Sequence, residues 1–491
     1  MTPARSPLAR LARGGCAALL LVAVGACGST VHGAAAPDLP TPTTAAPVDA
    51  GTGSAPGTVT GTGGSSGSGP SAAGDLVRAS SAVAGSAVAG AAGTPRRTVK
   101  VGFFISDDAS QIYKTLGISG ATHTREESRA LWGAVVAQVN ARGGLAGARV
   151  VPTYFFITSD SGSNASRAQQ ACTQFTEDDR VVAVVMDGAG DLSLARCLAK
   201  RHTPLVDVGQ TSYPYDDVDL RALAPYLYLP GRLSMSRFGA YVDELAGHGF
   251  FGKHAVVGLV RFDLPDQART AKDVIAPALR RHGLALTTDV AFTPVEGTGD
   301  LARASDEASA AVVRMRAAGV DHVLFLGSGL SLPYVFPTVA ESQGYRPRYG
   351  ITTDDGPEFM AGNAPAAQMT GAMAVGWEPQ YDVADSDSVL AGSPVWRSCV
   401  AVLHKAGFAA RDGRRCTAVY FLEAALRGQT STSAGALRRG ADLLGTTVYS
   451  TQTYATDVRP GHYDAVSAVR VLAFDSGCTC FRYRTGDVAV R

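Results

Sequence analysis

The stretch Thr98-Val-Lys-Val-Gly-Phe-Phe-Ile105 opens the part of the chain that is expected to fold. Its β-branched and aromatic residues predict a buried strand. Apolar residues at helical spacing over 125–142 predict a helix, and the glycines of 143–147 end it where a C-cap favours glycine. A second strand is predicted over 150–157. This strand–helix–strand order predicts a right-handed parallel βαβ unit.

The same alternation continues through much of the chain. It predicts an α/β protein with doubly wound parallel sheets. Because the segment 98–491 is longer than one hydrophobic core normally supports, we expect two lobes. The further strands are predicted at 181–186, 204–208, 254–260, 284–292, 322–326 and 350–353, and the further helices at 166–175, 266–281, 301–318 and 332–343.

The N-terminus has the layout of a bacterial lipoprotein signal. Three arginines precede the apolar run 16–24, which is too short to span a bilayer of about 30 Å. Val-Gly-Ala then leads into Cys27, in the manner of a lipobox. We therefore expect residues 1–26 to be a signal peptide and Cys27 to carry diacylglycerol, whose two acyl chains suffice for stable anchoring. The alternative is an ordinary signal peptide cleaved at another small residue.

Residues 27–97 are mostly Gly, Ser, Ala, Thr and Pro. Such a segment cannot bury enough apolar surface to offset its ordering entropy, so we expect a disordered tether. Together with the signal, it predicts an exported chain, lipid-anchored to the outer face of the bacterial cell membrane.

The remaining cysteines are even in number, which fits disulfides in an oxidising compartment. Closeness along the chain favours the pairs Cys172–Cys197 and Cys399–Cys416. Cys478 and Cys480 would then remain, and on a strand their side chains would share one face. The alternative is a metal site, but no Cys or His lies at zinc-finger spacing. We expect disulfides and no metal. These cysteines are Cys172, Cys197, Cys399, Cys416, Cys478 and Cys480.

Composition and motifs speak against nucleic-acid binding and catalysis. The net charge is +1 with no polybasic run, so nucleic acid is not expected as a partner. The hydrolase-like pattern 63–67 lies in the tether, away from any strand-to-helix elbow. The phosphate-loop-like run 247–253 is followed by His254, where a Ser or Thr would hold magnesium. We expect no enzyme activity and no cofactor.

Ligands of doubly wound sheets bind beyond the carboxyl ends of the strands. The residues at those positions are polar and include no His or nucleophile–base pair, which indicates binding. For each Asp the alternative is a helix N-cap, and for the glycines around Gly188 it is a tight turn in place of an anion-binding helix start. The candidates are Ser106, Asp107, Asp108, Asp187, Gly188, Ala189, Gln210, Thr211, Ser212, Arg261, Phe262, Asp263, Gly327, Ser328, Asp354 and Asp355.

Several segments between about 100 and 377 resemble type I periplasmic binding proteins, in the branch of the leucine/isoleucine/valine-binding receptors of ABC importers. The strongest is the run from Val139 through Asn140-Ala-Arg-Gly-Gly-Leu-Ala-Gly147, followed by the strand at Arg149, which is similar to that family's turn N-x-x-G-G-[IL]-x-G-[RK]. Segments 179–186, 202–206 and 317–323 are also similar to its strands and turns. Cys172 and Cys197 match the place of a disulfide in that branch.

The resemblance implies a clamshell in which the chain crosses between the lobes three times and a ligand closes the hinge. Lobe 1 would be 98–229 plus about 380–450, and lobe 2 would be 230–379 plus about 451–491. The resemblance implies that first-lobe positions hold an amino acid's carboxylate and second-lobe acids its ammonium. The former are Ala189, Gln210 and Thr211, and the latter are Asp263 and Asp355.

One departure from the family affects the expected ligand. Asp187-Gly-Ala-Gly190 stands where a pair of serines is usual. An Asp at that position would repel a carboxylate unless it were paired or protonated. A neutral or cationic ligand is therefore expected as readily as an amino acid.

Taken together, the sequence predicts a monomeric solute-binding lipoprotein. It would capture a small polar ligand, amino-acid-like or amide-like, and deliver it to an ABC permease. One alternative is a sensor that closes on its ligand and signals to a membrane partner. Another is a cell-envelope scaffold that has kept the fold and lost the ligand, which the long tether fits as well as it fits transport.

Overall fold

The computed structural model describes residues 97–106, 123–158, 162–188, 190–209, 214–327, 329, 331–384 and 389–490, except the side chain of Thr298. The predicted signal peptide, the lipidation site Cys27 and the tether up to residue 96 lie outside these residues. So do some of the candidate ligand residues, namely Asp107, Asp108, Ala189, Gln210, Thr211, Ser212 and Ser328.

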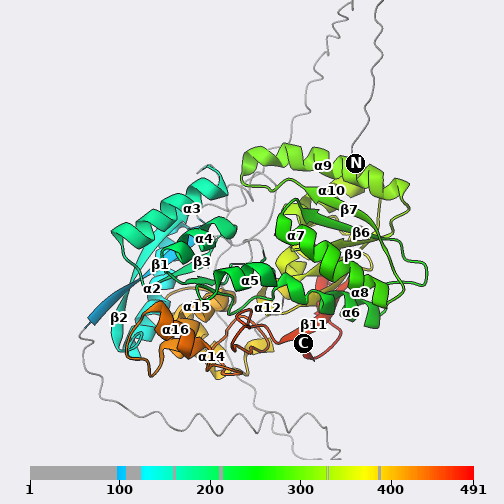
Figure 1. The fold of residues 1–491 in the computed structure, drawn as a ribbon. Coiled ribbons are helices and arrows are strands. Elements are labelled where there is room, and N and C mark those ends of the chain that lie inside the picture. Colours follow the sequence, from blue (N-terminus) through cyan, green and yellow to red (C-terminus); the bar gives the residue numbers. More distant parts are fainter. Residues whose placement is uncertain are drawn as a thin grey trace, which may run out of the picture. The chain divides into compact units, whose positions relative to one another are not determined.

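The first lobe is built on a parallel sheet with the strand order β2-β1-β3-β4-β5 (Figure 1). The predicted first strand forms β1 and pairs with both β2 and β3. The strands are β1 (Arg97–Ser106), β2 (Ala148–Ile157), β3 (Ala183–Asp187), β4 (Leu205–Asp207) and β5 (Leu227–Tyr228), and the intervening helices are α2 (Arg125–Ala141), α3 (Asn164–Thr173) with its π-helical extension η1 (Gln174–Asp178), α4 (Leu192–Lys200) and α5 (Asp217–Leu223).

Local chemistry explains where α2 begins. Thr124 accepts a hydrogen bond from the backbone N–H of Glu127, whose side chain accepts one from the backbone N–H of Thr124. This reciprocal capping box satisfies two N–H groups at the helix start. The apolar face of α2, including Trp132 and Val135, is buried in the core of the lobe.

The second lobe is built on a mixed sheet with the order β12-β11-β10-β9-β8-β6-β7. Its strands are β6 (Val257–Phe262), β7 (Leu286–Phe292), β8 (His322–Phe325), β9 (Arg348–Thr352), β10 (Met373–Gly376), β11 (Ala468–Asp475), β12 (Cys480–Tyr483) and β13 (Val488–Ala489). Its helices include α6 (Gly239–Gly247), α7 (Pro265–Thr270), the π-helical η3 (Ala271–Ile275), α8 (Ala276–Arg281), α9 (Leu301–Ala317), α10 (Ser331–Ser342) and α11 (Pro357–Asn363).

These observations confirm the predicted α/β class with parallel sheets in both lobes. The second sheet also has an edge that was not predicted, because β11 is antiparallel to β10, and β12 and β13 are antiparallel to β11. The turn between β11 and β12 spans only residues 476–479. A connection this short can join only antiparallel neighbours.

The C-terminal third contributes to both lobes. Helices α14 (Pro394–Lys405), α15 (Cys416–Leu426) and α16 (Ala434–Ala441), coloured orange in Figure 1, share the first lobe's core with α2. The chain from Val466 onward packs in the second lobe's cores. Near this passage, Leu229 forms a parallel bridge with Asp464, so the first and last connections between the lobes run side by side.

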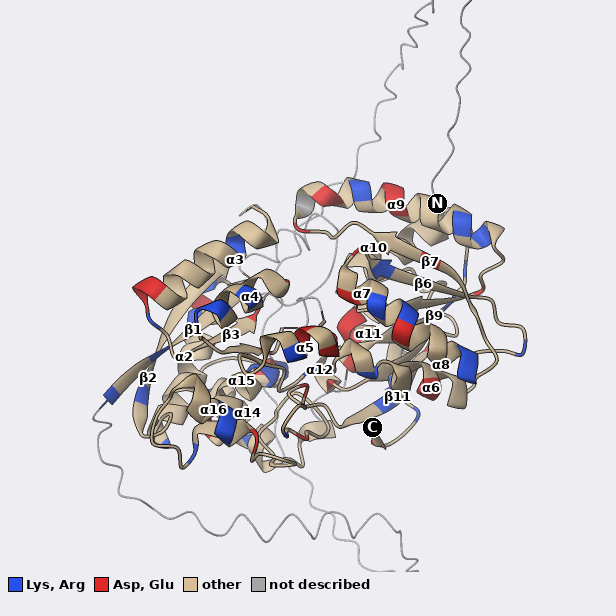
Figure 2. Cartoon of the chain, viewed as in Figure 1, with Lys and Arg blue, Asp and Glu red and all other residues tan. Residues whose placement is uncertain are grey.

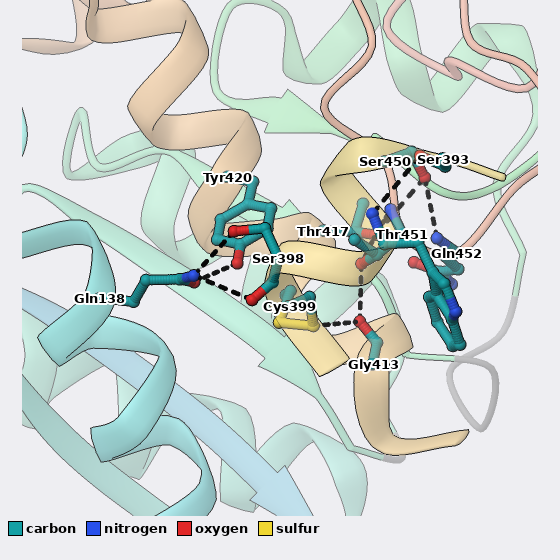
Figure 3. The surroundings of a disulfide bond; sticks show 12 residues. Gln138, Ser393, Ser398, Cys399, Gly413, Thr417, Tyr420, Ser450, Thr451 and Gln452 are labelled. Atoms are coloured by element: carbon teal, nitrogen blue, oxygen red, sulfur yellow. Dashed lines mark hydrogen bonds between the residues drawn. A yellow bond between two sulfur atoms is a disulfide. The ribbon is translucent and has the colours of Figure 1, made fainter. Parts of the chain in front are cut away.

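The structure contains the disulfides Cys172–Cys197, Cys399–Cys416 and Cys478–Cys480. The first joins α3 to α4. The second joins α14 to the start of α15, where both cysteines are fully buried. Figure 3 shows its surroundings, in which Thr451 donates to the carbonyl oxygen of Gly413 at 2.6 Å. This contact holds the last connection between the lobes against the segment that precedes α15.

Candidate ligand-binding site between the lobes

Two strand ends of the first lobe come together as the sequence predicted for a doubly wound sheet. A Cβ atom on Gly188 would lie only 2.7 Å from the backbone nitrogen of Ser106. Glycine is therefore required there by the close approach of the two chains. Asp187, directly before it, is buried at the end of β3.

Asp187 is ion-paired with two arginines from the C-terminal segment. Arg415 donates to one carboxylate oxygen at 2.7 Å, and Arg414 lies 3.0 Å from the other. Arg415 also contacts Asp412 at 2.5 Å, and Asp412 contacts His123 at 2.8 Å. The two carboxylates and two guanidinium groups balance in charge. Asp187 is thus paired, which removes the expected repulsion of a ligand carboxylate.

The cluster favours the ionised form of Asp412. Burial by itself would raise the pKa of Asp412, but His123 and the neighbouring guanidinium groups hold that pKa below its usual range. The disulfide Cys399–Cys416 lies next in sequence to Arg415 and ties the arginine-bearing segment η6 (Ala410–Arg415) to α14. The fold therefore fixes both arginines at the junction of the lobes.

A second ion cluster joins strand ends of both lobes through the first connection. Arg232 lies 2.8 Å from Asp207 at the end of β4 and 3.6 Å from Asp354 beyond the end of β9. All three side chains are at most 1% exposed. Burial raises the pKa of Asp354 to about 7, against the opposing effect of Arg232. We call these three residues the Arg232 triad.

The two second-lobe acids that the family resemblance suggested as ammonium partners, Asp263 and Asp355, are not part of the Arg232 triad. Asp355 accepts hydrogen bonds from the backbone nitrogen and hydroxyl of Thr352, both at 2.9 Å, and so caps a short 3₁₀ turn. Asp263 is exposed. Arg261 is paired with Asp289 within the second lobe. The predicted ammonium-binding role of Asp263 and Asp355 stays a prediction.

The connections between the lobes meet at Gln452. Its side-chain nitrogen donates to Glu378 at 2.7 Å and to the carbonyl oxygen of Val208 at 3.3 Å. A Cβ atom on Gly231 would lie 2.1 Å from the side-chain oxygen of Gln452, so a larger residue there would displace the amide of Gln452. Gln452 therefore links the last connection to the middle one and packs against the first.

Several buried polar atoms at this junction have no hydrogen-bond partner among the described residues. They include donors and acceptors, and buried polar groups without partners are costly and rare. Arg414 lies close to Asp187, yet its outer nitrogen Nη1 is not aligned for a hydrogen bond. Such groups are therefore candidates for hydrogen bonds to a bound polar solute. They are the carboxylate oxygens of Asp354, Oε1 of Gln380, Nη1 of Arg414 and Oε1 of Gln452.

The lobes also contact each other outside this junction. Arg269 of α7 lies 2.7 Å from Asp216, the N-cap of α5, where both signs of charge meet (Figure 2). Arg411 contacts Glu358 at 2.7 Å. A Cβ atom on Gly327 would lie 2.4 Å from Pro214 of the other lobe. Gly327 has a positive φ of 52°, so both backbone and space favour glycine there.

Asp187 and Asp354 were among the candidates from the sequence, but the residues that pair with them at the junction were not. Asp207 is the last residue of β4, one position before the end of the predicted strand 204–208, so the rule that selected polar residues beyond strand ends narrowly missed it. Arg232, Arg414 and Gln452 lie outside strand ends and carry no motif. Within the described residues, no group of His, Cys, Asp and Glu is arranged to hold a metal ion, and no helix has the length and apolar character needed to cross a membrane.

An α/β protein with two lobes and a buried polar junction at the strand ends of both sheets has the architecture of a ligand-binding receptor. The sequence model of the periplasmic binding protein family matches residues 118–391, and the chain belongs to this family. A search of curated protein sequences finds no match.

Solved structures with the same fold have low sequence identity to the chain. An ABC transporter substrate-binding protein from Aeropyrum pernix has a TM-score of 0.59 and 15% identity, covering 80% of this chain and 96% of its own. The branched-chain amino acid binding protein LivJ from Streptococcus pneumoniae, in complex with isoleucine, gives 0.54 and 16%, covering 80% and 100%. A Rhodopseudomonas palustris solute-binding protein, in complex with 3,4-dihydroxybenzoic acid, gives 0.57 and 10%, covering 80% and 98%.

Proposed function

We propose that this chain is an extracytoplasmic solute-binding lipoprotein that captures a small polar ligand between its lobes and delivers it to an ABC importer. The observation that carries the proposal is the set of buried donors and acceptors at the junction that have no hydrogen-bond partner among the described residues. Such a set favours a ligand with both acceptor and donor groups, as amino acids and amides have. Hinge closure would then remove the ligand from water.

The charge balance at Asp187 widens the ligand class beyond neutral and cationic solutes. Because Arg414 and Arg415 neutralise Asp187 and Asp412, a carboxylate is no longer repelled there. The structural relatives complexed with isoleucine and with 3,4-dihydroxybenzoic acid both hold carboxylates. We therefore propose an amino-acid-like or amide-like ligand, with carboxylate-bearing solutes included.

Thermal-shift screening of the purified protein tests ligand binding. The screen would contain branched-chain amino acids, primary amides, hydroxybenzoates and polyamines, and each compound that raises Tm would be titrated calorimetrically. At 100 times its Kd a ligand should stabilise the fold by about 2.7 kcal/mol. Arg414→Gln should abolish the shift, whereas Arg346→Gln, on a pair within the second lobe, should keep it. A protein that gains stability from none of these solutes would contradict the proposal.

Lipid anchoring is tested by cell fractionation. Cys27→Ala should move the protein from the membrane to the soluble fraction and remove the diacylglycerol mass from the N-terminal peptide. Cys16→Ala, in the apolar run of the signal, serves as the control and should stay membrane-bound. Retention of Cys27→Ala at the membrane would refute this anchor while leaving ligand binding open to its own test.

Delivery to an importer is tested by uptake. Cells lacking the protein should lose uptake of the radiolabelled compound that binds it, and wild-type protein should restore it. Arg414→Gln, still anchored but unable to bind, should not. Unchanged uptake by cells that lack a binding-competent receptor would count against transport and favour the sensing alternative.

A further inference from the structure

We propose that the Cys478–Cys480 disulfide is a site of thiol–disulfide exchange and is not a structural staple. It would react with a thiol, either a small-molecule thiol or a dithiol oxidoreductase. The inference is independent of solute binding and rests on the contrast among the chain's described disulfides.

The position of this disulfide gives a thiol direct access. It lies in the turn between β11 and β12, and β12 is an edge strand of the second sheet. Cys478 is exposed and Cys480 is half-buried. By contrast, Cys399 and Cys416 are both fully buried. In the remaining pair, Cys172 is buried and Cys197 is half-buried. Accessibility is one determinant of exchange rate.

The disulfide adds little to the fold. Its partners are separated by 2 positions, against 25 and 17 for the other pairs. The entropy that a cross-link removes from the unfolded chain grows with the length of the closed loop, so this one removes the least.

The turn is also closed without the sulfur–sulfur bond. Asp475 accepts from the backbone nitrogen of Gly477 at 2.8 Å and from Arg482 at 2.9 Å. The antiparallel ladder pairs Asp475 with Cys480, and the rings of Phe474 and Phe481 pack edge to face at 5.7 Å. Local hydrogen bonds and packing therefore set the register of this hairpin independently of the disulfide.

The intervening residue is strained. Thr479 has a φ of 52°, in the left-handed region that a β-branched residue rarely adopts. Such strain persists only where surrounding structure imposes it. Reduction opens the small ring around Thr479 and lets its backbone relax, which favours the dithiol form.

The exchange is chemically balanced. A donor thiolate bonds to the sulfur of Cys478, the bond to Cys480 breaks, and the departing sulfur takes the electron pair and then a proton from water. A second donor thiolate attacks the donor sulfur of the mixed disulfide and releases Cys478. Two electrons and two protons thereby pass from two donor thiols to the protein, and the donor leaves as a disulfide.

Differential alkylation of the native full-length protein tests the site. The protein is treated with low concentrations of dithiothreitol, quenched with iodoacetamide and analysed by peptide mass spectrometry. We expect Cys478 and Cys480 to be labelled at least about tenfold faster than the pair Cys172–Cys197, and Cys399–Cys416 last. Equal labelling of all pairs, or slower labelling of Cys478 and Cys480, would overturn the proposal.

Stability supplies an independent test. The double variant Cys478→Ser/Cys480→Ser should keep the wild-type Tm within about 1 °C, whereas Cys399→Ser/Cys416→Ser should lose several degrees. An equal loss in the first variant would make Cys478–Cys480 a structural staple and refute the proposal.

A matched pair of variants tests the backbone strain at Thr479. In glutathione redox buffers, Thr479→Gly should shift the midpoint severalfold toward the disulfide form, because glycine tolerates a positive φ. Ser476→Gly, an exposed residue of the same turn without a positive φ, should leave the midpoint unchanged. Identical midpoints for both variants would contradict the strained-dithiol mechanism.

Two parallel measurements distinguish the possible sources of the thiol. Reduction is measured with glutathione and with a Cys-x-x-Cys oxidoreductase at equal thiol concentration. Faster reduction by the oxidoreductase would identify a protein partner, and equal rates would identify small thiols. Failure of both donors to reduce this pair selectively would overturn the proposal.

Discussion

Among the ionic contacts that join the lobes, the Arg232 triad and the Arg411–Glu358 pair differ mainly in exposure. The Arg232 triad is buried, with side chains at most 1% exposed. The Arg411–Glu358 pair has side chains that are 49% and 26% exposed. Breaking a buried pair leaves a charge that water cannot solvate and costs about 3–5 kcal/mol, whereas exposed pairs contribute about 0–1 kcal/mol.

This difference indicates how the lobes can move. When they separate, Arg411 and Glu358 become hydrated at little cost. Arg232 lies on the connection between the lobes, so it can stay close to carboxylates of both sides. We infer that the hinge pivots near Arg232, while the pair Arg411–Glu358 opens and closes.

The largest effect is expected from Arg232→Met. The substitution removes the cation and leaves Asp207 and Asp354 buried without it, so the free energy of unfolding should fall by about 3–5 kcal/mol. Urea unfolding followed by circular dichroism measures the change.

The triple variant Arg232→Met/Asp207→Asn/Asp354→Asn is the control, because it removes the stranded charges as well. It should recover a large part of the loss. If the single and triple variants were equally destabilised, the cost would come from lost packing and not from buried charge.

A smaller, pH-dependent effect is expected from Asp354→Asn. Burial raises the pKa of Asp354 to about 7 in the folded protein, above the unfolded value of about 3.9. Protonated Asp354 therefore stabilises the folded state. This stabilisation is complete below about pH 4 and is lost as the pH rises through about 7. Wild-type protein should therefore lose about 1–2 kcal/mol relative to Asp354→Asn between pH 5.5 and 7.5.

Chemical denaturation of both proteins at pH 5.5, 6.5 and 7.5 measures this difference. Asp219→Asn provides a second case, because burial and the neighbouring Asp216 and Asp266 also raise the pKa of Asp219 to about 7. A stability difference that did not change with pH would mean that Asp354 keeps one protonation state throughout this range.

The contrast between local and long-range information explains what the sequence could predict. The strand 98–105 and the helix 125–142 were found within two residues of their observed limits, because apolar spacing and caps are local signals. The antiparallel edge of the second sheet was missed: the pairing of β11 with β10 depends on the topology of the whole second lobe, whereas the hairpin of β11 and β12 is local and could have been recognised from its short turn.

The junction shows the same limit. The search for polar residues at strand ends correctly placed Asp187 and Asp354 at the carboxyl ends of their strands. It did not find the residues that pair with them. Arg232 and Arg414 reach them from connections whose paths are set by tertiary packing. Asp355 fits the local pattern of a capping box with Thr352, so its structural role could have been recognised from the sequence.

The smallest effect is expected from Arg411→Ala. Loss of this half-exposed pair should cost less than about 1 kcal/mol of stability. Because the pair joins the lobes, its loss should nevertheless shift the population toward open forms, seen as a larger radius of gyration in small-angle X-ray scattering. Arg346→Ala, which removes an exposed pair within the second lobe, should leave that radius unchanged. Equal radii for the two variants would show that the Arg411–Glu358 pair takes no part in the opening motion, and the contacts of Arg232 and Arg269 would then be tested in the same way.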